Sequence, residues 1–213
     1  HLATSQNPFI ETFSSDNRRR LYAAILVPMM GGAGFYVTFV WLPVFMEDLL
    51  DPAIPYAFWI NVTSLFLTAF VFLPSAGWLA DQHGTVPVMK CGAVLFCLIA
   101  PVSLYLIGSL NDAMVSLYCE IAMAFAFSLF GSPLLAWLVE LFPPSVRLTS
   151  ISLGFNIAYA FGGGLGPAIS TALVVDVSNV SAGFFLSLTA IISLIGLYCV
   201  MPERVGLSGY HNN

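Results

Sequence analysis

Long runs of apolar residues, separated by short polar segments, make up most of this chain. Six such runs lie at about residues 21–46, 53–80, 86–108, 113–139, 149–175 and 183–201. A helix needs about 20 apolar residues to cross the hydrocarbon core of a bilayer. The pattern therefore predicts an all-α membrane protein with six transmembrane helices, a polar cytoplasmic linker at 1–20 and a cytoplasmic tail at 202–213.

The composition agrees with this interpretation and excludes several other classes of protein. The chain is 59% hydrophobic and only 8% charged, whereas soluble domains are about 25% charged. A soluble core is therefore excluded. The formal net charge of −5 gives no reason to expect nucleic-acid binding, and the one basic cluster is Arg18–Arg20.

The basic residues fall on one side of the six predicted spans. If the intervening segments are assigned alternately to the two sides, every Lys and Arg lies on the side of the termini. These residues are Arg18, Arg19, Arg20, Lys90, Arg147 and Arg204. The opposite side has no basic residue and carries several acidic ones, among them Glu47, Asp112 and Asp176. Because basic loops stay cytoplasmic, this asymmetry predicts that both termini are cytoplasmic.

The six spans differ in polarity. The spans at 86–108 and 183–201 are almost purely apolar, so we expect them to face lipid on most sides. The other four carry isolated polar residues, which are costly in lipid and should face the interior or an aqueous cavity. The candidate binding residues among them are Tyr36, Asn61, Glu120, Asn156 and Tyr159.

Glu120 is the one acidic residue well inside a span. It follows Asp112 by eight positions, which places it about 12 Å below the outer end of a helix. Burial disfavours the charged form of a carboxyl group, so a proton could bind there during transport. We expect Glu120 to bind a coupling proton or to contact a substrate. The structural alternative is a permanently protonated or hydrogen-bonded residue that holds helices together.

The first and fifth spans contain helix-breaking residues. Pro28 and Pro43 interrupt the first span, and Gly162, Gly163, Gly166 and Pro167 interrupt the fifth. Broken helices near the middle of the membrane often mark transport sites. The alternative is close helix packing through the pair Gly162 and Gly166. The two interpretations are compatible, and these four residues of the fifth span are our hinge candidates.

Two cytoplasmic segments carry a recognisable set of charges. One runs from Gly77 to Gly84 and contains Asp81, and the other runs from Glu140 to Arg147. One cation and two carboxylates could form an ionic cluster at the ends of neighbouring helices. The alternative is solvated loop charges, whose pairing contributes about 0–1 kcal/mol.

The segment Gly77-Trp-Leu-Ala-Asp-Gln-His-Gly84 resembles the signature loop of the major facilitator superfamily. Glu140-Leu-Phe-Pro-Pro-Ser-Val-Arg147, followed by Gly162-Gly-Gly-Leu-Gly-Pro167, is similar to its metabolite:proton symporter branch. The resemblance implies a C-terminal six-helix half-bundle of a twelve-helix carrier. It also implies that Asp81, Glu140 and Arg147, with Gly77 and Gly84, form a cytoplasmic gate.

This resemblance implies half of a secondary active transporter in a bacterial inner membrane. Its expected activity is proton-coupled symport of a small organic acid or zwitterion by alternating access. The implied partners are the lipid bilayer, the substrate, the proton, and either a missing N-terminal six-helix half or a second copy of this half. A receptor or scaffold derived from a carrier is the alternative.

Enzymatic, cofactor and metal chemistry find no support in the sequence. His1, His83 and His211 all lie outside the spans, so no intramembrane serine has a base within reach. The four cysteines lie within spans and show no metal-binding spacing, which predicts that they pack as small apolar residues. We therefore expect no enzyme, no cofactor and no metal site.

Overall fold

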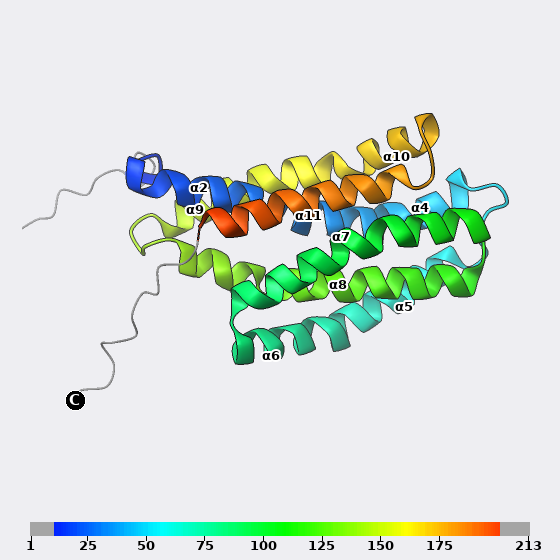
Figure 1. Ribbon diagram of the computed structural model, residues 1–213, viewed down its shortest axis with the longest axis horizontal. Helices are drawn as coiled ribbons and strands as arrows, with labels where there is room; N and C mark the ends of the chain where they lie inside the picture. The colour runs from blue at the N-terminus through cyan, green and yellow to red at the C-terminus, as the bar shows by residue number, and fades with distance from the viewer. Residues whose placement is uncertain (1–10, 201–213) are drawn as a thin grey trace, which may run out of the picture.

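The computed structural model describes residues 11–200, most of which are helical (Figure 1). Six helices in that range are long and apolar enough to cross a membrane, which confirms the predicted number of spans and the all-α class. Two parts of the prediction, the tail at 202–213 and the first half of the linker, lie outside the described residues.

Three spans are assembled from several helical pieces. Span one consists of α2 (Ser15–Leu26), α3 (Pro28–Phe35), α4 (Leu42–Val44) and two π-helical segments, Tyr36–Trp41 and Phe45–Leu49. Span two consists of α5 (Ala57–Leu67), a π-helical segment (Thr68–Phe72) and α6 (Leu73–His83). Span five consists of α9 (Arg147–Tyr159), a π-helical segment (Ala160–Gly164) and α10 (Gly166–Asp176).

The other three spans are continuous helices. They are α7 (Thr85–Leu110), α8 (Ala113–Leu141) and α11 (Ser181–Cys199). The predicted interruptions of spans one and five are therefore present, and span two has an interruption that the sequence analysis did not predict. In a π-helix each turn holds an extra residue, and such segments occur frequently at functional sites.

The first helix begins before the predicted membrane boundary. α2 starts at Ser15, so residues 15–20 are helical and extend span one beyond the expected start at 21. Just before this helix, Thr12 Oγ1 and Ser150 Oγ of α9 lie 3.1 Å apart. The Ser145 hydroxyl also donates to Glu11 Oε1 at 3.3 Å. The second half of the expected linker is thus docked on the start of span five.

The spans interleave in a regular way. Span one packs against spans five and six, and span four packs against spans two and three. Spans three and six, α7 and α11, pack against each other in the middle of the bundle (Figure 1). Spans one to three form one set of three helices, and spans four to six form the other. The first helix of each set therefore packs on the second and third helices of the other set. This pairing is expected when two three-helix repeats are related by an approximate twofold axis.

Burial does not follow the polarity of the spans in the way that the sequence analysis expected. Burial was compared over one apolar stretch of 18 residues in each span. Spans one and four are the most buried, with 67% and 61% of these residues inside the protein. Spans two and five carry polar residues, yet only 22% and 33% of the corresponding residues are buried. Within the described residues, no other helix covers the outer faces of spans two and five, whereas α7 and α11 pack against each other and bury part of each other's surface.

A serine of span six supplies hydrogen bonds to the backbone of span one at its interruption. Pro28 starts α3 and has no backbone N–H, so the chain bends at Val27. The buried Ser193 hydroxyl donates to the Val27 carbonyl at 2.8 Å and accepts from the Met30 N–H at 3.2 Å. Lipid offers no hydrogen bonds to such groups, so the bend depends on this partner.

We expect Ser193→Ala to lower the free energy of unfolding in mixed micelles by about 1 kcal/mol, because buried backbone groups lose their partner. Unfolding with increasing denaturing detergent, followed by circular dichroism, measures the change. Ser75→Ala is the matched control, since the exposed Ser75 hydroxyl bonds only to Val71 O in its own span. An equal loss of unfolding free energy in the two variants would contradict the proposed role of Ser193.

Candidate functional site

Glu120 lies inside the bundle with no hydrogen-bond partner. Its side chain is 0% exposed, and neither carboxyl oxygen has a partner among the described residues. Ser64 of α5 and Glu120 of α8 each lie about two turns after the start of their helices, and these two helices pack against each other. Ser64 is also 0% exposed, and its hydroxyl oxygen likewise has no partner among the described residues. We call Glu120, Ser64 and the nearby Asn61 the acid site.

The two helices of the acid site are positioned by ordinary helix rules. Asp112 begins α8, where its carboxylate accepts from the N–H groups of Met114 and Val115 at 2.9 Å. Glu120 follows eight residues later on the continuous helix. On α5, Asn61 and Ser64 are three residues apart and therefore share one face. The Asn61 Oδ1 atom is also buried without a partner.

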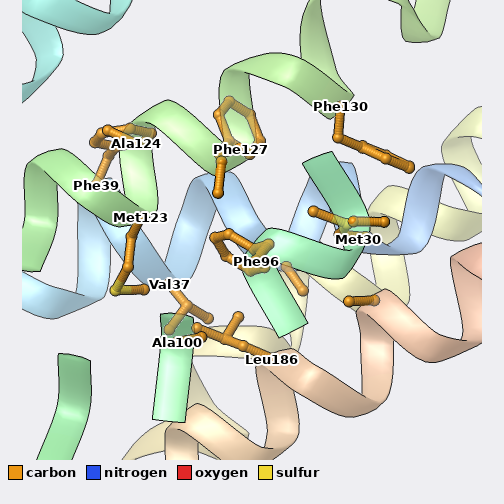
Figure 2. Close-up of a cluster of buried hydrophobic side chains, with 14 of the residues drawn as sticks. Met30, Val37, Phe39, Phe96, Ala100, Met123, Ala124, Phe127, Phe130 and Leu186 are labelled. Carbon is orange, nitrogen blue, oxygen red and sulfur yellow. The ribbon is translucent and has the colours of Figure 1, made fainter. Parts of the chain in front are cut away.

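An apolar core adjoins the acid site toward the middle of the bundle. Met123, Ala124 and Phe127 of α8 pack with Phe39 of span one and with Phe96 of α7 (Figure 2). The Phe39 and Phe127 rings meet edge to face, with centroids 5.8 Å apart. Dry surroundings of this kind raise the cost of a charge on Glu120, because few dipoles can solvate it.

Two predicted tyrosines meet at a different place. Tyr36 begins the π-helical segment of span one, and its ring lies where a side chain at Gly163 would stand. Tyr159 ends α9, is close enough to interact electrostatically with Tyr36, and stacks on Phe155 with centroids 4.1 Å apart. The Tyr36 side chain is 39% exposed. This tyrosine pair therefore borders the surface, unlike the acid site.

Asn156 lies one turn from Tyr159, but its side-chain amide already makes a hydrogen bond within α9. Its side chain is exposed, and its amide donates to the Ser152 carbonyl at 2.7 Å within the same helix. The five predicted binding residues therefore separate into two groups. Glu120 and Asn61 belong to the acid site, whereas Tyr36, Tyr159 and Asn156 lie along the junction of spans one and five.

The glycines of span five are sites of close backbone packing. A Cβ atom at Gly163 would lie 2.8 Å from the Tyr36 ring, and one at Gly162 would overlap the Met29 carbonyl oxygen. Gly166 and Pro167 begin α10 directly after the π-helical segment. The small-residue packing that the sequence analysis considered is thus present, and a hinge at the same residues is compatible with it.

The charges that were predicted to form a cytoplasmic gate do not form the expected cluster in this conformation. Asp81 and Glu140 are exposed, and among residues 11–200 no ion pair joins either of them to Arg147. Arg147 instead donates from Nε to the Phe142 carbonyl at 3.1 Å, which closes the turn between α8 and α9. An ionic gate at this end would therefore require a conformation different from this one.

Two glycines of the same region have clear structural roles. Gly84 has φ +92°, a backbone conformation that favours glycine, and it joins α6 to α7. Gly77 faces the Ser132 side chain, whose hydroxyl donates to the Leu73 carbonyl at 2.9 Å. Nearby, a hollow of about 520 Å³ between α6 and α8 is lined mainly by apolar side chains and contains none of the predicted binding residues.

Known relatives of this chain are bacterial transport proteins. It is 25% identical to a citrate-proton symporter of Klebsiella pneumoniae over 88% of the chain and 42% of the relative. It is 31% identical to a citrate-proton symporter of Salmonella typhi over 84% of the chain and 41% of the relative. An inner membrane metabolite transport protein of Escherichia coli is 33% identical over 63% of the chain and 30% of the relative. No family model and no solved structure matches the chain.

These relatives confirm the resemblance to the major facilitator superfamily that the sequence motifs carry. Their names, citrate-proton symporter and metabolite transport protein, agree with the metabolite:proton symporter branch that the segments Gly77–Gly84 and Glu140–Arg147 indicated. They are transporters rather than enzymes, so the prediction of a non-enzyme is also confirmed. The chain spans about two fifths of the length of the citrate-proton symporters that it matches.

One residue of the acid site, Ser64, was not predicted from the sequence. Ser64 is a small residue in an apolar helix, and such serines are usually bonded to their own backbone. Ser128 is an example, since its hydroxyl donates to Ala124 O at 2.7 Å. The spacing of Ser64 from Asn61 was a usable signal, because it places two polar groups on one face of α5.

We expect Gly162→Ala to destabilise the protein by about 2 kcal/mol, because the added methyl group would push spans one and five apart. Gly164→Ala is the matched control: its Cβ would have 3.9 Å to the nearest atom, the Tyr159 carbonyl oxygen. Thermal unfolding in detergent, followed by size-exclusion chromatography, compares the two. A stable Gly162→Ala protein would show that the backbones do not touch there.

Proposed function

We propose that this chain forms the C-terminal six-helix half of a secondary transporter that moves a small organic acid together with protons. The citrate-proton symporters and metabolite transport proteins among its relatives support this proposal. The six apolar spans support a multi-pass protein of the bacterial inner membrane. The other half is proposed because the relatives are more than twice as long as the region that they share with this chain.

The observation that carries the proposal is the buried and unpartnered carboxyl group of Glu120. An acid at membrane depth is costly, and such residues usually belong to an ion pathway or a proton relay. Neither carboxyl oxygen has a hydrogen-bond partner among residues 11–200, so in this conformation no hydrogen bond from Glu120 holds two helices together. A proton bound at Glu120 would neutralise the charge while the site is closed.

Substrate contact is proposed for the junction of spans one and five. Tyr36 and Tyr159 each place a hydroxyl-bearing side chain at this junction, and Asn156 adds an amide one turn from Tyr159. Hydroxyl and amide donors suit the oxygens of an organic acid. The described Lys and Arg residues lie near the ends of the spans, with Lys90 placed over the Tyr198 ring at 3.8 Å. A cationic partner for a substrate carboxylate would therefore come from the other half.

We expect Glu120→Gln to abolish uptake driven by an imposed pH gradient in proteoliposomes of the full-length protein. Glutamine keeps the size of the side chain but cannot bind and release the coupling proton. Exchange of radiolabelled organic acid without a gradient should persist, which separates lost coupling from lost folding. Glu47→Gln is the control, because the Glu47 side chain is exposed and belongs to neither the acid site nor the candidate gate. Gradient-driven uptake that survives in Glu120→Gln would exclude Glu120 as the coupling group.

We also propose that both termini face the cytoplasm, which the one-sided distribution of Lys and Arg supports. Single cysteines at the exposed residues Ser109 and Ser145, in a background without the four native cysteines, test this orientation. A membrane-impermeant maleimide added to intact cells should label Ser109→Cys and leave Ser145→Cys unlabelled until the cells are opened. The reverse pattern would invert the proposed topology.

A further inference from the structure

We propose that Ser64 completes a proton-binding site with Glu120, so that the proton is held between span two and span four. The inference rests on the proposed proton-coupled function and adds a residue that neither the sequence motifs nor the relatives assign. Ser64 and Glu120 are both 0% exposed and come from two helices that pack against each other, and their oxygens have no partner among the described residues. Buried polar groups are rarely left in this state.

A serine hydroxyl suits this position because it can both donate and accept a hydrogen bond. When Glu120 is protonated, its O–H donates to Ser64 Oγ, and the Ser64 O–H turns toward another acceptor. Asn61 Oδ1 offers one, since it lies on the same face of α5 and is buried without a partner. When Glu120 is ionised, the Ser64 O–H donates to the carboxylate instead. Rotation of one hydroxyl therefore serves both states, and the proton is exchanged with water when the site opens.

Other ionisable groups do not take over this role. The titratable groups on α8 and on the elements packed against it are Tyr36, Asp81, His83, Lys90, Cys91, Cys97, Tyr105, Asp112, Tyr118, Cys119, Glu140, Arg147 and Tyr159. None of them forms a hydrogen bond with either carboxyl oxygen of Glu120 among residues 11–200. α5 carries no titratable residue at all. Ser64 is thus the polar partner that the protein itself supplies.

The backbone around Ser64 provides a way to open the site. The π-helical segment Thr68–Phe72 begins one turn after Ser64, and Thr68 Oγ1 donates to the Ser64 carbonyl at 2.7 Å. Beyond this segment, span two is tied to α8 by the hydrogen bond from Ser132 to the Leu73 carbonyl. A bend at the π-helical segment would therefore move α5 away from Glu120 while α6 stays in place.

Infrared spectroscopy of the full-length protein in lipid nanodiscs tests the site directly. A carboxyl C=O band that disappears in Glu120→Gln belongs to Glu120. We expect Ser64→Ala to shift this band to higher frequency and to change its pH midpoint, because the protonated acid loses its partner. Ser64→Thr should restore the wild-type band, since threonine keeps a hydroxyl. Ser64→Cys should give a smaller shift in the same direction, because a thiol is a weaker partner.

Ser128→Ala is the matched control, since it removes a buried hydroxyl from α8 that bonds only to Ala124 O. An unshifted band in Ser64→Ala, or equal shifts in Ser64→Ala and Ser128→Ala, would overturn the role of Ser64 and leave Glu120 as the coupling group. Loss of the band when sodium is added at constant pH would assign the oxygens to a metal cation and overturn the proton site. If Glu120→Gln removes no band, the proposed function itself fails.

Discussion

The bundle depends on supplying hydrogen bonds to backbone groups that lipid cannot satisfy. Proline and π-helical turns disturb the regular pairing of several spans, and each freed group inside the hydrocarbon would cost several kcal/mol. Side chains of neighbouring spans supply partners at these places. Ser193 serves the bend before Pro28. Ser187 donates to the Cys97 carbonyl at 2.6 Å, four residues before Pro101. Irregular helices are therefore stable here only as a packed set.

The acid site departs most from this pattern, since it holds four of the seven buried side-chain oxygens that lack a hydrogen-bond partner among the described residues. Many other serine and threonine hydroxyls are bonded to carbonyl groups, as Ser116 is to Asp112 O at 2.8 Å. Glu120 and Ser64 keep unsatisfied oxygens at 0% exposure in the same protein. A transporter needs at least one group whose bonding changes during its cycle, and such a group cannot also be fully satisfied in every state. The unsatisfied oxygens are therefore consistent with a site that changes its partners.

Much of this architecture could be predicted from the chain alone, because membrane spans are determined mainly by length and apolarity. The six spans, the interruptions at Pro28 and Gly162, and the burial of Glu120 all follow from single residues in their local context. Contacts between distant residues could not be predicted in the same way. The packing of α5 on α8, the use of Arg147 to close a turn, and the π-helical segment in span two depend on how helices are placed against one another.

The interleaved packing of the spans has a consequence for how the protein is made. Gly32 of span one approaches the backbone of Gly163 in span five, where a Cβ atom would lie 3.0 Å from the Gly163 nitrogen. At a synthesis rate of about 5–20 residues per second, span five leaves the ribosome on the order of ten seconds after span one. During that interval the bend before Pro28 has neither its packing surface nor Ser193. Span one must therefore wait in the membrane, or beside the insertion machinery, with its backbone groups provisionally satisfied by something other than its final partners.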